Sequence, residues 1–223
     1  MDIMLTTSKK NFSKYHLRIY YVHSSYIYCV NNLLLRGLLF FILGFTSMES
    51  LTQNIPEDAL FLENSNRIMK KIRDFNYFEL MNHVSPERGL RFSPYAHVDT
   101  INDVQLSPQE IKAVITSKES IHWGSFDGSG DSILMSFAKY HQKFVYDVDF
   151  LNAEKIEIDQ FIGSGNSLNN LQTAYPNCRF VEYHFSGFDE KYDKMDWRSL
   201  RLVFKKEKAK YYLVGIIHAQ WTI

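Results

Sequence analysis

The sequence predicts an α+β domain in which one long N-terminal helix packs on a bent antiparallel sheet. Two observations indicate this class. Apolar residues recur at helical spacing from residue 56 to residue 81, and three strand-like runs occupy residues 179–185, 200–204 and 211–223. The order of a long helix, then helical fragments, then strands is typical of α+β folds. We expect a single domain over residues 51–223.

The predicted helix begins with a clear start signal. Asn54 is a capping residue, Pro56 suits the first turn, and Glu57 and Asp58 follow where the helix dipole favours acids. Its apolar residues recur at three- and four-residue intervals or their sums: Phe61, Ile68, Ile72, Phe75 and Phe78. We expect the helix to end near Val84, because Ser85, Pro86 and Gly89 break the pattern.

Shorter elements are predicted in the middle of the chain. Pro94 indicates an extended or irregular connector over residues 91–98. A capping box starting at Ser107 predicts a second, short helix. Residues 120–126 are predicted as a strand, closed by a tight turn over residues 127–131. A helical face follows, formed by Phe137, Tyr140, His141 and Phe144.

Alternation along the three final strands predicts one apolar and one polar sheet face. The apolar set is Val181, Tyr183 and Phe185 with Leu200, Leu202 and Phe204, and with Leu213, Gly215, Ile217, Ala219 and Trp221. The opposite set is mixed and includes Glu182, His184, Arg201, His218 and Gln220. An apolar sheet face needs a cover, and we expect helix 56–81 to provide it. The polar face is then expected to lie in solvent.

Residues 1–50 are predicted to be a leader outside the fold. Residues 33–45 read LLLRGLLFFILGF, an apolar run that is short for a membrane span and fits the core of a signal peptide. About thirty residues precede this run, so we expect them to be an extension upstream of the true translation start. The leader predicts export to the periplasm or the exterior, or membrane anchoring if it is not cleaved.

Charge and motif content exclude several function classes. The 223 residues include 25 basic and 25 acidic side chains, so there is no basic excess to neutralise nucleic-acid phosphates, and we expect no nucleic-acid partner. The chain lacks zinc-site spacing, a P-loop, a dinucleotide fingerprint and the G-x-S-x-G and H-E-x-x-H motifs. We therefore expect no metal ion and no cofactor.

Several long strings carry a family resemblance: RFSPYAHVD (91–99), IHWGSFDGSGD (121–131), FVYDVDF (144–150), the segment 180–204 and YLVGIIHAQWTI (212–223). Together they resemble a family of small exported bacterial proteins of unknown function. The resemblance implies an NTF2-like, or cystatin-like, cone and no particular chemistry. The family commonly carries an acid where this chain has Ala219 and a proline where it has Ser186, so a role of that acid does not transfer.

Two groups of residues are candidate ligand contacts. Glu182, His184, Arg201 and His218 share the polar face by alternation, where they could transfer protons or bind an anion. The alternative is that they are ordinary charges on a wet surface. Asp196 and Trp197, with Trp123 and Trp221, could line the open end of a cavity between sheet and helix, although tryptophans are more often core residues.

No catalytic signature is present, so we expect a non-enzymatic domain that binds a small ligand, a cell-envelope component or a second copy of itself. One alternative is an isomerase, dehydratase or hydrolase that uses a pocket acid or histidine such as Asp196 or His218. Another is an interaction module without a ligand.

Overall fold

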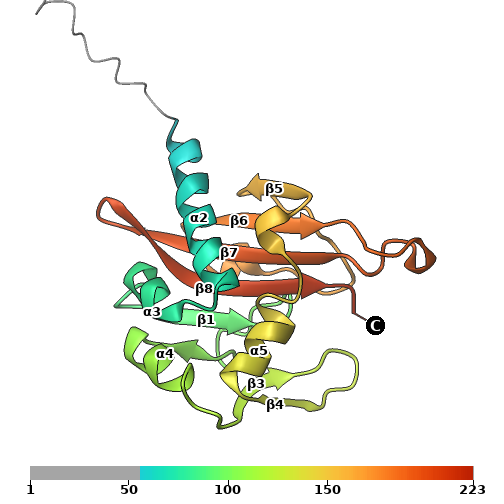
Figure 1. Cartoon of the computed structure of the whole chain (residues 1–223). Coiled ribbons are helices and arrows are strands. Elements are labelled where there is room, and N and C mark those ends of the chain that lie inside the picture. The colour runs from blue at the N-terminus through green and yellow to red at the C-terminus, as the bar shows by residue number, and fades with distance from the viewer. Residues whose placement is uncertain (1–55, 223) are drawn as a thin grey trace, which may run out of the picture. The chain divides into compact units, whose positions relative to one another are not determined.

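The computed structural model describes residues 56–222, which form a mixed α+β domain with a six-stranded sheet and a separate hairpin (Figure 1). The α+β class is therefore confirmed, whereas the leader lies outside the described residues. Within residues 56–222, no helix combines the length and the apolar character that crossing a bilayer requires. In order, the large sheet contains β2 (Gln105–Leu106), β1 (Leu90–Ser93), β8 (Lys210–Gln220), β7 (Arg198–Glu207), β6 (Cys178–Phe185) and β5 (Lys155–Ile158).

The hairpin pairs β3 (Ile121–Ser125) with β4 (Ser132–Met135). The predicted strand 120–126, the turn after it and the capping-box helix are confirmed. The α-helices are α2 (Glu57–Arg73), α3 (Tyr77–Leu80), α4 (Pro108–Val114), α5 (Phe137–Phe144) and α6 (Leu171–Ala174). Short 3-10 turns lie at η1 (Met81–His83), η2 (Phe150–Asn152) and η3 (Glu190–Tyr192).

The prediction of one continuous helix over residues 56–81 is wrong, because α2 ends at Arg73. Phe75 adopts a left-handed backbone with φ of 52°, which turns the chain. Asn76 then caps α3, its side chain accepting a hydrogen bond from the Glu79 amide. The apolar spacing continues through this break, so spacing alone did not reveal it.

Not every strand pair of the large sheet is antiparallel. The pairs β5–β6, β6–β7 and β7–β8 are antiparallel, as predicted. β1, however, pairs with β8 in parallel, with Arg91 opposite Gly215 and Ser93 opposite Ile217. The connector predicted over residues 91–98 therefore begins as a strand and leaves the sheet at Pro94.

A β-bulge in β8 overturns the predicted face of that strand. Val203 lies opposite Gly215 whereas the next residue, Phe204, lies opposite Leu213, so Val214 is an extra residue. Beyond the bulge the alternation is reversed. Ile217 and Ala219, which are predicted on the helix-covered face with Leu202, therefore lie on the other face of the sheet. Ile216 and His218 lie on the helix-covered face in their place.

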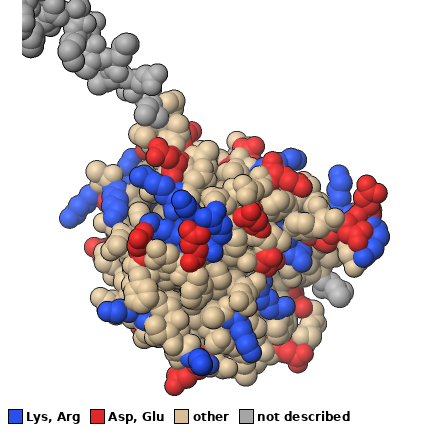
Figure 2. All heavy atoms as spheres, in the orientation of Figure 1, with Lys and Arg blue, Asp and Glu red and all other residues tan. Residues whose placement is uncertain are grey.

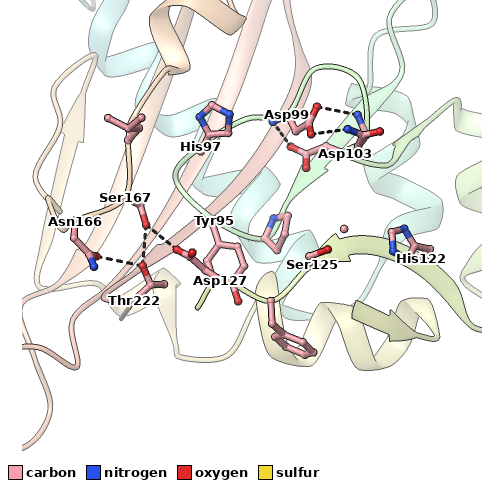
Figure 3. A pocket seen from close by; sticks show the side chains of 15 residues that line it. Tyr95, His97, Asp99, Asp103, His122, Ser125, Asp127, Asn166, Ser167 and Thr222 are labelled. Carbon is pink, nitrogen blue, oxygen red and sulfur yellow. Dashed lines mark hydrogen bonds between the residues drawn. The ribbon is translucent and has the colours of Figure 1, made fainter. Parts of the chain in front are cut away.

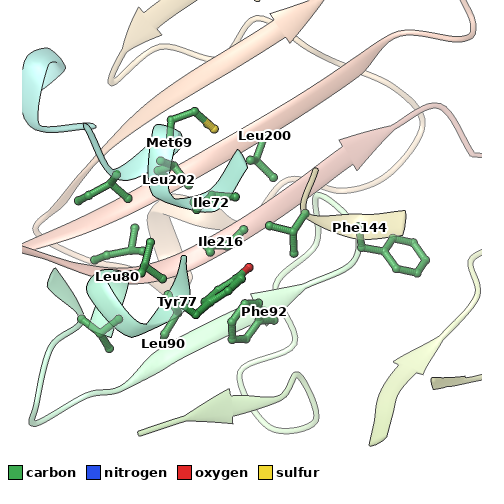
Figure 4. Packing of buried hydrophobic residues seen from close by; sticks show 14 of the residues in the cluster. Met69, Ile72, Tyr77, Leu80, Leu90, Phe92, Phe144, Leu200, Leu202 and Ile216 are labelled. Atoms are coloured by element: carbon green, nitrogen blue, oxygen red, sulfur yellow. The ribbon is translucent and has the colours of Figure 1, made fainter. Parts of the chain in front are cut away.

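The helix-covered face holds the main core (Figure 4). α2 crosses β6, β7 and β8, and its buried Ile68 and Ile72 belong to the same cluster as Leu200, Leu202 and Ile216 (Figure 1). The Tyr183 hydroxyl also reaches α2 and donates a hydrogen bond to Ser65 Oγ at 2.8 Å. Full burial of each aliphatic side chain stabilises the fold by about 1.5–3 kcal/mol, so this contact fixes the helix on the sheet.

The opposite face of the sheet is covered too, which corrects the prediction that it lies in solvent. Phe180, Val203 and Ile217 form a second buried cluster there with Val98 and Leu171. The chain after Pro94 and the segment around α6 provide this cover. The contact is tight at Gly215, where an added Cβ atom would lie 2.7 Å from the Tyr175 hydroxyl and would force that side chain to shift.

Candidate functional site

A groove of about 730 Å³ opens on the described surface, and we call it the acidic groove (Figure 3). It lies between the chain that follows β1, the hairpin β3–β4 and the segment at residues 166–168. Its polar lining consists of three aspartates, two histidines, a tyrosine and several hydroxyl and amide groups: Asp99, Asp103, Asp127, His97, His122, Tyr95, Ser125, Ser167, Asn102, Asn166 and Thr222.

The first wall is a closed turn between Asp99 and Asp103. The Asp103 amide donates to the Asp99 carbonyl at 3.0 Å, and the Asp99 amide donates to Asp103 Oδ2 at 3.0 Å. Arg91 of β1 fixes the turn from behind, because its Nη1 donates to both the Asp99 and the Asp103 carbonyls. The turn thus presents its carboxylates from a rigid backbone.

The three aspartates do not share one environment. Hydrogen bonds from the Asn102 side chain and from neighbouring backbone amides hold the pKa of Asp99 below its ordinary value. Burial instead raises the pKa of Asp103 to about 6, although the hydrogen bond from Ser93 Oγ, at 2.5 Å, opposes the rise. Asp99 is therefore charged at neutral pH, whereas Asp103 titrates near pH 6.

The second wall comes from the turn after β3. Gly128 and Gly130 take positive φ values of 87° and 73°, which lets the chain reverse tightly and places Asp127 at the groove. Ser167 Oγ donates to Asp127 Oδ2 at 3.2 Å and also lies 2.9 Å from the Thr222 hydroxyl. These contacts tie the turn to the segment 166–168 and to the chain just after β8 (Figure 3).

The charge of the groove is one-sided. No lysine or arginine lines it, whereas three carboxylates do. Half-buried Tyr95 and Phe126 add aromatic surface. Within residues 56–222, no three acidic, histidine or cysteine side chains are arranged to hold a metal ion. A positively charged organic group with hydrogen-bond donors is the ligand that this lining favours.

The predicted candidates lie elsewhere, and three of them form a buried network beneath the segment 161–165. Glu182 is fully buried and pairs with Arg201, whose Nε lies 2.9 Å from Glu182 Oε2. Ser199 Oγ donates to Glu182 Oε1 at 2.6 Å and lies 2.8 Å from His184 Nδ1. Burial lowers the pKa of His184, so this histidine is neutral at pH 7.

This network serves the backbone of residues 162 and 163. The amides of Ile162 and Gly163 donate to Glu182, and Arg201 Nη2 donates to the Gly163 carbonyl at 2.9 Å. The four side chains are buried, and none of them lines the acidic groove. The network therefore fixes the chain that leads to the groove wall at residues 166–168.

His218 is separated from that network, because the bulge places it on the helix-covered face. It is fully buried, with Nε2 3.2 Å from Asp147 Oδ1 and its ring edge-on to Phe144. Burial raises the pKa of Asp147, but His218 and Arg198 outweigh this effect and hold it below the ordinary value. His218 thus positions Asp147 and does not meet Glu182 or His184.

The remaining candidates do not form one cavity lining. Trp123 is fully buried and stacks on Tyr140 with ring centroids 3.9 Å apart. Trp197 and Trp221 do approach each other across Gly165, and Trp221 is 41% exposed. Asp196 accepts hydrogen bonds from the amides of residues 188 and 189, which closes the loop between β6 and β7.

Sequence reasoning missed the acidic groove. The available signal was the density of polar residues in two connectors, HVDTIND over residues 97–103 and FDGSGD over residues 126–131. Residues 91–98 are predicted only as an extended or irregular connector, and residues 127–131 only as a tight turn. Their convergence depends on the parallel pairing of β1 with β8, which strand alternation does not indicate.

Comparisons of the chain with protein-family models, with curated proteins and with solved structures find no match. The class is therefore defined by the fold and the site alone: an α+β domain that carries an aspartate- and histidine-lined groove at the edge of its main sheet. The NTF2-like exported family remains a prediction.

Proposed function

We propose that this chain is a binding domain whose acidic groove takes a small organic cation. The observation that carries the proposal is the lining: three carboxylates and neither a lysine nor an arginine border a groove of about 730 Å³. Asp99 is charged and its turn is held rigidly by Arg91, so little ordering is needed when a ligand binds. The Tyr95 ring supplies a face on which a quaternary or protonated amine packs.

Calorimetric titration of the full chain with choline, and with glucose as a neutral comparison, tests this proposal. We expect saturable binding of choline, weakened roughly tenfold in the double variant Asp99→Asn/Asp127→Asn, because two attractive charges are lost. The double variant Glu63→Gln/Glu119→Gln removes equal charge from exposed positions outside the groove and should bind as the unmodified chain does. Binding of glucose alone, or equal losses in the two variants, would contradict the proposal.

An enzyme that transfers a proton is the second candidate, and one observation favours it. Asp103 lines the groove with a pKa of about 6, and groups that titrate near neutrality suit general acid–base chemistry. Asp103→Asn distinguishes the two functions, because it abolishes turnover in an enzyme yet leaves choline binding within about a factor of three if Asp103 is only part of the wall.

The NTF2-like cone, export and self-association are further proposals. The packing of α2 on the six-stranded sheet of order β2-β1-β8-β7-β6-β5 supports the first, and the apolar run at residues 33–45 supports the second. Native mass spectrometry of the purified protein reports the processed mass, the subunit count and any co-purified ligand together. A mass that includes residues 1–50 after expression in a secreting host would contradict cleavage.

A further inference from the structure

A second groove, of about 480 Å³, has the opposite charge character, and we call it the basic groove. It lies between α5, the start of β7 and the end of β8. Seven residues line it: Met135, Lys139, Gln142, Lys143, Asp147, Arg198 and Gln220. Three of them are cations and one is an acid. Figure 2 shows basic side chains over the position of α5 on the visible face.

The lone acid does not neutralise the two lysines. Asp147 Oδ2 accepts from Arg198 Nε at 3.0 Å, and its Oδ1 faces His218 Nε2 at 3.2 Å. Both oxygens of the carboxylate are therefore engaged away from α5. Within residues 56–222, neither Lys139 nor Lys143 forms an ion pair.

The two lysines stand four residues apart on one face of α5, so they repel each other. The helix dipole favours Lys143 in the last turn, but it does not account for Lys139, which lies in the turn before. The Lys143 ammonium is held 5.6 Å from the Phe126 ring centre and 5.5 Å from that of Phe144. This contact positions the charge at the groove.

Arg198 is also held at the groove, in its case by hydrogen bonds. Its Nη1 donates to the carbonyls of Asp196 and Trp197, at 3.0 and 2.9 Å, while Nε binds Asp147. Its Nη2 has no hydrogen-bond partner within the described residues. A guanidinium that is fixed on two sides and open on the third is preorganised to donate to an added acceptor.

From this arrangement we infer that the basic groove binds an oxyanion, a phosphate or carboxylate group of a small molecule. Lys139 and Lys143 supply charge from one side, Arg198 Nη2 donates from the other, and the amides of Gln142 and Gln220 complete the set of donors. The inference is independent of the acidic groove, since the two grooves share no lining residue.

Titration of the full chain with inorganic phosphate and, separately, with succinate tests this site by calorimetry at low ionic strength. Saturable binding of phosphate alone assigns a phosphate ligand, and binding of succinate alone assigns a carboxylate ligand. We expect Lys139→Gln/Lys143→Gln to weaken binding at least about fivefold, because exposed charge-assisted contacts each contribute a few-fold. Lys139→Arg/Lys143→Arg keeps both charges and should keep binding within about twofold.

The matched control is Lys112→Gln/Lys118→Gln, which removes two charges from exposed positions in α4 and just after it. Thermal unfolding confirms that each variant is folded before titration. Equal weakening in the two glutamine variants shows a general charge effect and overturns the site. Absence of saturable binding of either anion to the unmodified chain overturns it as well.

Discussion

The buried pair of Glu182 and Arg201 gives the sharpest prediction of stability. Both side chains are almost completely buried, 0% and 1% exposed, so neither can turn to water when its partner is removed. Removing one partner of such a pair costs up to about 3–5 kcal/mol, whereas replacing both partners with neutral groups costs less than the two single changes together. The two single changes should nevertheless differ in the stability that they remove, because the carboxylate and the guanidinium keep different numbers of hydrogen bonds to uncharged groups.

The carboxylate is the better supported ion. In Arg201→Met, Glu182 keeps hydrogen bonds from the amides of Ile162 and Gly163 and from the Ser199 hydroxyl. In Glu182→Gln, the guanidinium loses its only charged partner, and Arg201 Nη1 already has no partner within the described residues. We therefore expect a loss of about 4 kcal/mol for Glu182→Gln and about 2 kcal/mol for Arg201→Met.

Urea unfolding at pH 7 measures both losses and that of the double variant Glu182→Gln/Arg201→Met. We expect the double variant to lose about 3 kcal/mol, which gives a coupling of about 3 kcal/mol between the two positions. Lys206→Gln breaks the exposed pair with Glu57 and serves as a control that leaves the midpoint almost unchanged. Additive single losses, or a larger loss for Arg201→Met than for Glu182→Gln, would refute this reasoning.

Three further changes test other parts of the structure. Burial raises the pKa of Asp103 to about 6, so its contribution to stability is fully present below about pH 4 and is lost as the pH rises through 6. Asp103→Asn should abolish this loss, so the variant should be about 1–2 kcal/mol more stable than the unmodified chain at pH 7. Urea unfolding of both proteins at pH 4 and pH 7 measures this difference, and equal stability at pH 7 would disprove the prediction. Burial lowers the pKa of His141 to about 4, so the neutral ring stabilises the fold above pH 6.5 and up to about 3 kcal/mol is lost as the pH falls to 4. In His141→Gln the acid-induced fall in urea midpoint should shrink, and an unchanged fall would assign it to other groups. Gly163→Ala should destabilise the domain by about 1–3 kcal/mol, because the new Cβ would lie 2.6 Å from Ser199 Oγ and from the Trp197 ring. Faster amide hydrogen exchange at residues 161–168 is the accompanying signature, and its absence would show that the wall does not depend on this contact.

Local patterns predicted those elements whose signals lie within a few residues. The capping box at Ser107 and the glycines of the 127–131 turn specify hydrogen bonds with near neighbours, and the structure contains both. The three final strands are also present, because alternation and β-branched or aromatic residues mark each run. Mixed α+β architecture followed from this order of elements.

Features that depend on one added residue or on distant pairing escaped prediction. No pattern in the sequence indicates the bulge at Val214. The bulge nevertheless places His218 on the sheet face that carries Leu200, not on the face that carries Glu182. The break at Phe75 lies within an unbroken apolar period. The acidic groove combines connectors that follow β1 and β3 with the segment 166–168, so its lining is a property of the assembled sheet.

The position of β8 has a consequence for how the protein comes into being. Of the described strands, β8 is synthesised last, yet it separates β7 from β1 and hydrogen-bonds to both. Until residues 210–220 have emerged from the ribosome, β1 has no place in the large sheet. Contacts between parts of the chain so far apart in sequence slow folding, so the nascent polypeptide would stay open to chaperones through most of its synthesis.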